Sequence, residues 1–350
     1  MPEATNPNPF HALMKHRLAW PLVTLFLLLA LNTAFNPSLL HIEVRSGHLY
    51  GSLIDILNRA APLVLVSLGM TLVIATRGID ISVGAVVAIA AALAAWMIGG
   101  SVKPDVSRFP MWLAIVSAIA LALACGVWNG LLVAKVGMQP IIATLILMVA
   151  GRGIAQLITS GQIITIYYAP YFFLGSGYLF GLPFSVYVAA LVFALLYLAI
   201  TRSALGLFIQ AVGINPGAAR VAGVRARRIV VGAYMFCGFC AGVAGLLISS
   251  NVKSADGNNA GQLLDLDAIL AVTLGGTALT GGRFSLVGSV VGALIIQTLT
   301  YAIYSLGVPP EINLVVKAVV VFAVMLLQSA EFRASLRQLA LRPAHGGAAR

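Results

Sequence analysis

The chain has 350 residues, of which 60% are hydrophobic and 9% are charged, and its formal net charge is +11. Soluble domains carry about 25% charged residues, so this composition excludes an ordinary soluble protein and indicates an integral membrane protein. The positive charges gather at the chain ends and in one internal segment, where membrane topology and lipid headgroups account for them. Nucleic acid is therefore not an expected partner.

Ten apolar segments are candidates for crossing a bilayer, since a spanning helix needs about 20 largely apolar residues. The eighth of them is short. We expect an all-α integral membrane protein, a polytopic bundle of about ten transmembrane helices with broken helices and with N and C termini in the cytoplasm. The segments cover residues 18–35, 56–76, 83–99, 111–134, 140–159, 182–200, 229–250, 266–279, 284–305 and 312–329.

The ends of the chain agree with this topology. The first segment follows Lys15 and Arg17, and no convincing small-x-small cleavage site comes after it, so we expect an anchor and not a cleaved signal peptide. An even number of spans places both ends on one side, and arginines in the last 20 residues favour the cytoplasmic side. The expected parts are a cytoplasmic tail over 1–17, one transmembrane domain over 18–329 and a basic cytoplasmic tail over 330–350.

The first predicted helix break lies at residues 76–84, which read TRGIDISVG. Gly78 permits backbone angles that a helix does not use, and Asp80 and Ser82 are both good N-cap residues. Irregular backbone at membrane depth is tolerated only where protein buries it or where it lines a wet cavity. Two roles for Asp80 stay open: it caps a helix and neutralises Arg77, or it lines a substrate path.

A second break is expected between the eighth and ninth segments, where the sequence is rich in glycine. Its order of hydroxyl and glycine residues loosely repeats that of the first break, which suggests a duplicated architecture with a pathway between the halves. Neither break contains a phosphate-binding GxxxxGK[ST] pattern, so nucleotide binding by this chain is excluded. The glycines expected to interrupt the helices here are Gly275, Gly276 and Gly282.

Polar side chains inside apolar segments either join helices or touch a transported molecule. A cation at the centre of its segment, such as Arg152 between two glycines, needs a carboxylate or a cavity. The other members of this set are Asn129, Thr144, Gln156 and Lys317.

No catalytic or metal-binding constellation is evident. Cys237 and Cys240 have the spacing of a redox motif, but their apolar surroundings favour close helix packing. All five histidines lie near the termini or in loops, without metal-ligand spacing. We expect no cofactor and no metal site.

Residues 201–228 form the only long basic interruption, with five arginines and no acidic residue, and the positive-inside rule places them in the cytoplasm. Their centre predicts a short helix with Pro216 in its first turn, and with Ala218 and Ala219 on a small-residue face. Such a cytoplasmic projection suits docking to another protein, and it indicates a membrane subunit driven from outside itself. The residues expected to carry this coupling are Gly213, Asn215, Ala218, Ala219 and Gly223.

Several of these motifs resemble one known family. TRGIDISVG resembles the TGGIDLSVG signature of the membrane permeases of bacterial sugar ABC importers of the ribose, xylose and galactofuranose type, although Arg77 stands where that pattern has glycine. Residues 213–224 resemble the loop with which such permeases contact their ATPase. Other matching stretches are 126–130, 139–145 and 265–276, and those that most resemble galactofuranose importers are 54–62, 150–163, 255–261 and 309–321.

The resemblance implies a multi-pass permease subunit of the bacterial inner membrane and not an enzyme. It implies a cytoplasmic ABC ATPase subunit, a periplasmic sugar-binding protein and a second permease copy or paralogue as partners, with the lipid bilayer around them. A monosaccharide, with galactofuranose favoured over ribose or xylose, is the expected cargo. Residues expected along its path or at its gate are Asp80, Ser82, Gly84, Asn129, Thr144 and Arg152.

Three other readings of the same chain stay open. An ion-coupled secondary sugar transporter would use carboxylates such as Asp80 and Asp267 inside the membrane. A passive solute channel and a membrane scaffold are the others, and neither gives a reason for the motif at 213–224.

Overall fold

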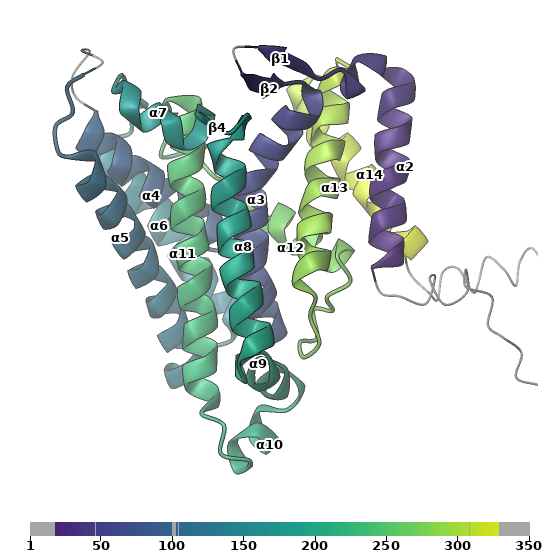
Figure 1. Ribbon diagram of the computed structural model, residues 1–350. Coiled ribbons are helices and arrows are strands. Elements are labelled where there is room, and N and C mark those ends of the chain that lie inside the picture. The colour runs from purple at the N-terminus through teal and green to yellow at the C-terminus, as the bar shows by residue number, and fades with distance from the viewer. Residues whose placement is uncertain (1–17, 46, 100–102, 104, 308, 329–350) are drawn as a thin grey trace, which may run out of the picture.

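The computed structural model describes residues 18–45, 47–99, 103, 105–307 and 309–328. Within this described part the chain forms thirteen α-helices and three short antiparallel strand pairs (Figure 1). The prediction of an all-helical membrane protein is confirmed at this level. The predicted terminal tails, 1–17 and 330–350, lie outside the described residues.

The helices are α2 (Ala19–Phe35), α3 (Ser52–Ala75), α4 (Val83–Ile98), α5 (Met111–Leu131), α6 (Pro140–Thr159), α7 (Ala169–Ser176), α8 (Phe184–Arg202), α9 (Leu205–Ile214), α10 (Pro216–Val221), α11 (Ala226–Val252), α12 (Leu264–Leu274), α13 (Leu286–Ser305) and α14 (Pro310–Gln328). A 3-10 turn, η1 (Pro37–Leu40), follows α2, and a π-helical turn, η2 (Leu132–Val136), extends α5. The strand pairs are β1 (Glu43–Arg45) with β2 (His48–Tyr50), β3 (Ile164–Thr165) with β6 (Ser254–Ala255), and β4 (Tyr178–Leu179) with β5 (Leu182–Pro183).

Within the described residues, six helices are long and apolar enough to cross a membrane: α3, α5 with η2, α6, α8, α11 and α13. The apolar helices α2 and α4 are shorter, with 17 and 16 residues. The eighth predicted segment corresponds to α12, whose 11 residues extend roughly 16 Å at 1.5 Å per residue, about half of the hydrocarbon thickness. It ends early because Gly275 and Gly276 follow Leu274, so α12 alone is not a span.

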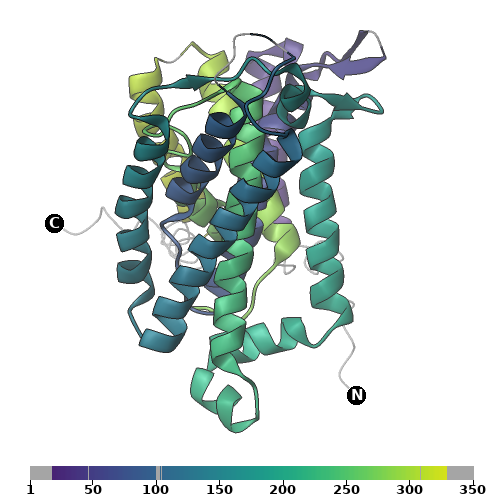
Figure 2. The ribbon, with the colours of Figure 1, turned by 90° about the vertical axis from the view of Figure 1, so that its left-hand side faces the viewer.

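The centre of the bundle consists of α3, α4 and α11 (Figures 1 and 2). Nearly every residue of α4 is buried, which explains a sequence that is apolar on all sides. Small residues allow the close approach: a Cβ added to Gly69 of α3 would lie 2.7 Å from the Cα of Cys237 on α11. Cys237 and Cys240 are free and buried, so their predicted packing role is confirmed.

Both predicted breaks are irregular segments that end one helix and begin another. Residues 76–82 separate α3 from α4, and residues 275–285 separate α12 from α13. The left-handed residue of the first break is Arg77, with φ 65°, which the sequence did not predict. Gly78 is required instead by packing, because an added Cβ would lie 2.5 Å from the hydroxyl of Tyr234.

The bundle has two distinct ends. β1, β2, β4 and α7 lie at one end, and α10 projects from the other as a small knob at the foot of α11 (Figure 1). α9 lies across the bundle beside this knob and not along it (Figure 2). We call the segment from α9 through α10 the coupling segment.

Candidate functional site

Three of the residues predicted for the pathway form one hydrogen-bonded cluster. Asp80 Oδ1 accepts from the backbone N–H of Ser82 at 3.1 Å, from Ser82 Oγ at 2.6 Å and from Asn129 Nδ2 at 3.3 Å. The same amide of Asn129 donates to Ser82 Oγ at 2.8 Å. The cluster thus ties the first break to α5.

This cluster lies behind the surface. Asp80 is 2% exposed, and Ser82 and Asn129 are completely buried. In this conformation they support the break from inside the protein, and their place along the pathway or at its gate stays a prediction. Among the described residues Asp80 has no cationic partner, since Arg77 points away to the carbonyl of Ile214, so the predicted neutralisation of Arg77 by Asp80 is wrong.

The helix cap at this break also differs from the prediction. Ser82 occupies the N-cap position of α4, but its hydroxyl donates to Asp80 and makes no cap to the helix. Ser285, at the start of α13, does cap its helix by accepting from the N–H of Gly288 at 3.0 Å. The two breaks therefore differ in local chemistry although their sequences are similar.

Thr144 is also buried and lies beside the first break. Its hydroxyl donates to Pro140 within α6 at 3.0 Å, with the carbonyl of Ile79 at 3.4 Å. It joins α6 to the break and does not line an open surface.

Gly84 and Arg152 lie on an open groove of about 670 Å³ between the start of α4, α6 and the loop before α12. Gly84 brings two backbones together there, because an added Cβ would overlap the carbonyl oxygen of Gly261. Most of the lining is apolar, and a few polar groups converge on it, as is typical of a small-molecule site. The polar lining residues are Arg152, Gln156, Gln262 and Asp265.

Arg152 holds the loop that closes one side of this groove. Its Nη1 donates to the carbonyls of Ala260 at 2.6 Å, Asn258 at 3.0 Å and Gly257 at 3.5 Å. Gln156, one helical turn later, donates to Asn258 Oδ1. Arg152 meets the expectation of a carboxylate or a cavity because it faces the groove, and its direct hydrogen-bond partners are backbone carbonyls.

The nearby carboxylates of Asp265 and Asp256 stabilise the charge of Arg152 electrostatically. The backbone N–H of Asn258 and the side chain of Asn259 donate to Asp256, and these hydrogen bonds lower the pKa of its carboxyl. Asp256 therefore remains ionised near neutral pH. Gln262 and Asp265 were not among the predicted site residues. The one sequence signal that could have indicated Asp265 is the family-like stretch 265–276, which begins at this residue.

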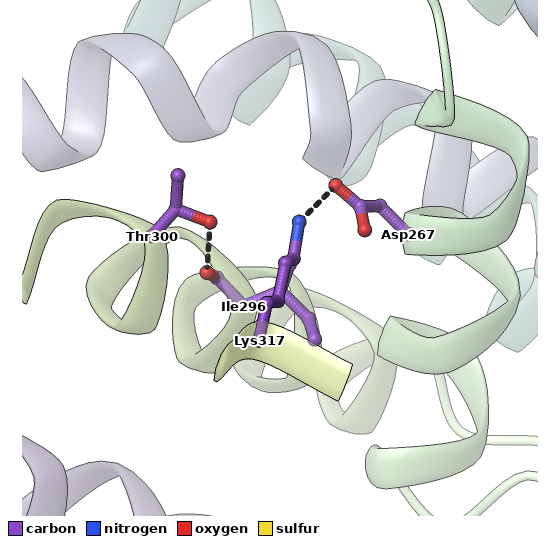
Figure 3. Close-up of polar contacts among 4 residues, drawn as sticks. All are labelled: Asp267, Ile296, Thr300 and Lys317. Atoms are coloured by element: carbon purple, nitrogen blue, oxygen red, sulfur yellow. Dashed lines mark hydrogen bonds and ion pairs between the residues drawn. The ribbon is translucent and has the colours of Figure 1, made fainter. Parts of the chain in front are cut away.

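Asp267 and Lys317, which are 50 positions apart, form an ion pair. Lys317 Nζ lies 2.6 Å from Asp267 Oδ2, and Figure 3 shows the two side chains pointing at each other from α14 and α12. The nearby Thr300 hydroxyl donates within α13 to the carbonyl of Ile296 at 2.9 Å and takes no part in the pair (Figure 3). The charge of Asp267 is thus compensated, which weakens its candidacy as an ion-coupling carboxylate.

A second polar hollow, of about 250 Å³, lies near the end of the bundle that carries β4 and α7. The sequence prediction missed it, because its residues come from α3, α7, α8, α11 and α13 and share no local motif. Ser185 donates to Asn58 Oδ1 at its edge. Its polar lining residues are Asn58, Arg59, Ser185, Asn251 and Gln297.

The coupling segment contains the predicted short helix. Asn215 caps α10 by accepting from the N–H of Ala218 at 3.0 Å, Pro216 is its first residue, and Gly223 follows it at φ 84°. The shared face of Ala218 and Ala219 is not observed: Ala219 packs inward and Ala218 is exposed. Successive helix residues point about 100° apart, since a turn takes 3.6 residues.

Gly213 was predicted as a docking residue, but its position at the end of α9 is buried. Beside α10, a hollow of about 480 Å³ is lined by arginines, and Val221 at the end of α10 is exposed. The knob therefore presents positive charge and an exposed apolar side chain. The arginines are Arg220, Arg225, Arg227 and Arg228.

A bundle of apolar helices with two internal breaks, a largely apolar groove with converging polar groups at one of them and a projecting basic knob defines a membrane transport protein. Residues 52–325 match the family described as the permease component of branched-chain amino acid transport systems, and the chain belongs to this permease family.

Three relatives are similar over nearly their full lengths. The galactofuranose transporter permease protein YtfT of Escherichia coli (strain K12) is 49% identical, over 95% of each chain. The fructose import permease protein FruF of Bifidobacterium longum (strain NCC 2705) is 38% identical, over 93% of this chain and 92% of the relative. The ribose import permease protein RbsC of Bacillus subtilis (strain 168) is 37% identical, over 88% and 91%. No solved structure matches the chain.

Proposed function

We propose that this chain forms the membrane pathway of an ATP-driven, binding-protein-dependent importer of a monosaccharide, with galactofuranose as cargo. The single observation that carries the proposal is the 49% identity to a galactofuranose transporter permease over 95% of both chains. Identity to the fructose and ribose permeases is lower, at 38% and 37%. The subunit supplies a path and no catalytic chemistry, so ATP hydrolysis resides in a partner.

The groove at the first break is a suitable surface for a sugar. Sugars bind through many hydroxyl groups, which both donate and accept hydrogen bonds. Arg152 and Gln156 offer donors, Asp265 offers an acceptor, and Gln262 offers both. The groove is open, which suits a permease that holds its cargo weakly and releases it.

The two ends of the bundle suit different partners. The basic knob at α10 faces the cytoplasm in this proposal and receives the ABC ATPase subunit, because lysine and arginine are retained on that side. The opposite end, with β1, β2 and α7, receives the periplasmic sugar-binding protein. About ten membrane passages with both termini cytoplasmic, where the short α12 and the irregular chain beside it count as one passage, are part of the same proposal. A second permease copy or paralogue completes the pathway.

Reconstitution tests the cargo and the energy source together. The permease is placed in liposomes with its ATPase, and the purified sugar-binding protein and labelled galactofuranose are added on the receptor side, with ATP on the ATPase side. Accumulation that needs ATP and the binding protein is expected, with galactopyranose, fructose and ribose competing weakly. Accumulation by the chain alone under a proton gradient would instead establish a secondary transporter, and strong competition by ribose or fructose would reassign the cargo.

The cap of α10 gives a test of the coupling segment. Asn215→Leu removes the acceptor for the N–H of Ala218, and the loss of an N-cap costs about 1 kcal/mol. We expect roughly fivefold weaker copurification of the ATPase and a similar fall in sugar-stimulated ATP hydrolysis.

Asn215→Ser is the matched control, because serine is an equally good cap and keeps a side-chain oxygen at this position. It should leave assembly and coupling close to wild type. Normal ATPase attachment and hydrolysis in Asn215→Leu would contradict the docking role of α10.

A further inference from the structure

A side-chain contact connects the first break directly to the coupling segment. Arg77 Nη2 donates to the carbonyl oxygen of Ile214 at 2.5 Å. Ile214 is the last residue of α9, and the carbonyls of a last helical turn have no partner within the helix. A cation at this position satisfies such a carbonyl and interacts favourably with the negative end of the helix dipole.

The backbone at Arg77 is unfavourable for its residue type. Its φ of 65° is left-handed, a conformation that glycine adopts freely and that the Cβ of an arginine resists. The related permease signature has glycine at this position, which would need no compensation. The strain persists where surrounding contacts over-determine the conformation, and the bond to Ile214 is such a contact.

The second break also packs against this contact between the first break and α9. The N–H of Gly282 donates to the carbonyl of Ala75, the last residue of α3, at 2.9 Å. A Cβ on Gly281 would lie 2.5 Å from Arg77 Cγ, and a Cβ on Gly213 would overlap the Ala75 carbonyl oxygen. Backbones from α3, α9 and the second break therefore meet without intervening side chains, and this joint leaves little room for independent movement.

We infer that Arg77 is a positioning residue that transmits displacement of the coupling segment to the first helix break. This inference rests on the proposed ATP-driven function and assigns its mechanical link. Movement of α9 carries the Ile214 carbonyl, and through it Arg77, which is three residues before Asp80. The buried cluster of Asp80 then passes the displacement to the start of α4, where Gly84 borders the groove.

The test compares Arg77→Gly, Arg77→Lys and Arg77→Met in the complete transporter with its ATPase and sugar-binding protein. Arg77→Gly should fold at least as well as wild type, because glycine accepts the left-handed backbone. Its ATPase copurification should be unchanged, while sugar-stimulated hydrolysis and uptake per ATP fall about tenfold, the loss expected for one hydrogen bond to a charged group. Arg77→Lys should recover part of this coupling, and Arg77→Met should not.

Amide hydrogen exchange distinguishes transmission through Arg77 from a purely structural role of this residue. ATPase binding should slow exchange in residues 76–84 of the wild type and leave it unchanged in Arg77→Gly. Lys135→Met, which removes an exposed cation from η2, is the control and should behave as wild type in every assay.

The outcomes separate the two proposals. If wild-type protein shows no ATP-dependent uptake, the proposed function fails and the role of Arg77 fails with it. If wild type imports sugar and Arg77→Gly couples equally well, only the role of Arg77 is overturned. Loss of ATPase attachment or of folding in Arg77→Gly would likewise overturn it, in favour of a structural role.

Discussion

Replacing Lys317 with methionine should destabilise the protein by about 3 kcal/mol, the lower end of the effect of breaking a buried ion pair from one side, because this pair is partly buried. Lys317 Nζ lies 2.6 Å from Asp267 Oδ2, and the two side chains are only 13% and 21% exposed. Methionine keeps much of the volume but leaves Asp267 as an uncompensated charge in apolar surroundings. The thermal midpoint of the detergent-purified protein, followed by size-exclusion recovery after heating, measures the change.

The double variant Asp267→Asn with Lys317→Met is the control for this result. Removing both charges should restore most of the stability, since neutral replacement of an ion pair is often tolerated. The comparison matters for function because Asp267 lies on α12 and Lys317 on α14. The pair holds the short helix α12, whose first turn lines the groove, against α14. A single variant as stable as the wild type would mean that Asp267 is neutral or hydrated.

Replacing Asp80 with leucine should have the second large effect. The substitution leaves two buried donors of Ser82 and one of Asn129 without their acceptor, and each stranded group costs about 1–3 kcal/mol. We expect low yield of folded protein and no measurable uptake. Expression level, thermal midpoint and uptake in the reconstituted system are the measurements.

Asp80→Asn separates the charge of Asp80 from its role as an acceptor. An asparagine keeps one oxygen for Ser82 but brings an N–H₂ group into a cluster already rich in donors. It should fold and bind the ATPase normally while uptake falls. Wild-type uptake by this variant would show that the negative charge is dispensable, and normal folding of Asp80→Leu would contradict the support role of the cluster.

Much of the architecture could be predicted from local sequence. Apolar run length predicts helices such as α3 and α11, because a bilayer imposes a minimum span. Glycine and proline punctuation predicts the two breaks and the start of α10 at Pro216, because these residues act on their own backbone. The left-handed conformation of Arg77 was not predicted, since the partner that holds this residue comes from α9.

The candidate site was predicted only as a set of polar residues. Asp80, Ser82 and Asn129 were expected along the pathway or at its gate, and the rotation of α5 and the fold of the break bring them together as a buried support. Gly84 and Arg152 do lie on the groove, whereas Gln262 from the loop before α12 and Asp265 from the first turn of α12 were not predicted as site residues.

Local sequence was enough to predict the class of protein, the apolar helices, their interruptions and a basic projection, because each depends on hydropathy, charge or backbone preference over a few neighbouring residues. Which polar groups meet became known from the three-dimensional packing alone. Asp267 with Lys317 and Arg77 with Ile214 are 50 and 137 positions apart, and such contacts depend on helix rotation and depth. Those quantities are set by the packing of the whole bundle, which no local pattern encodes.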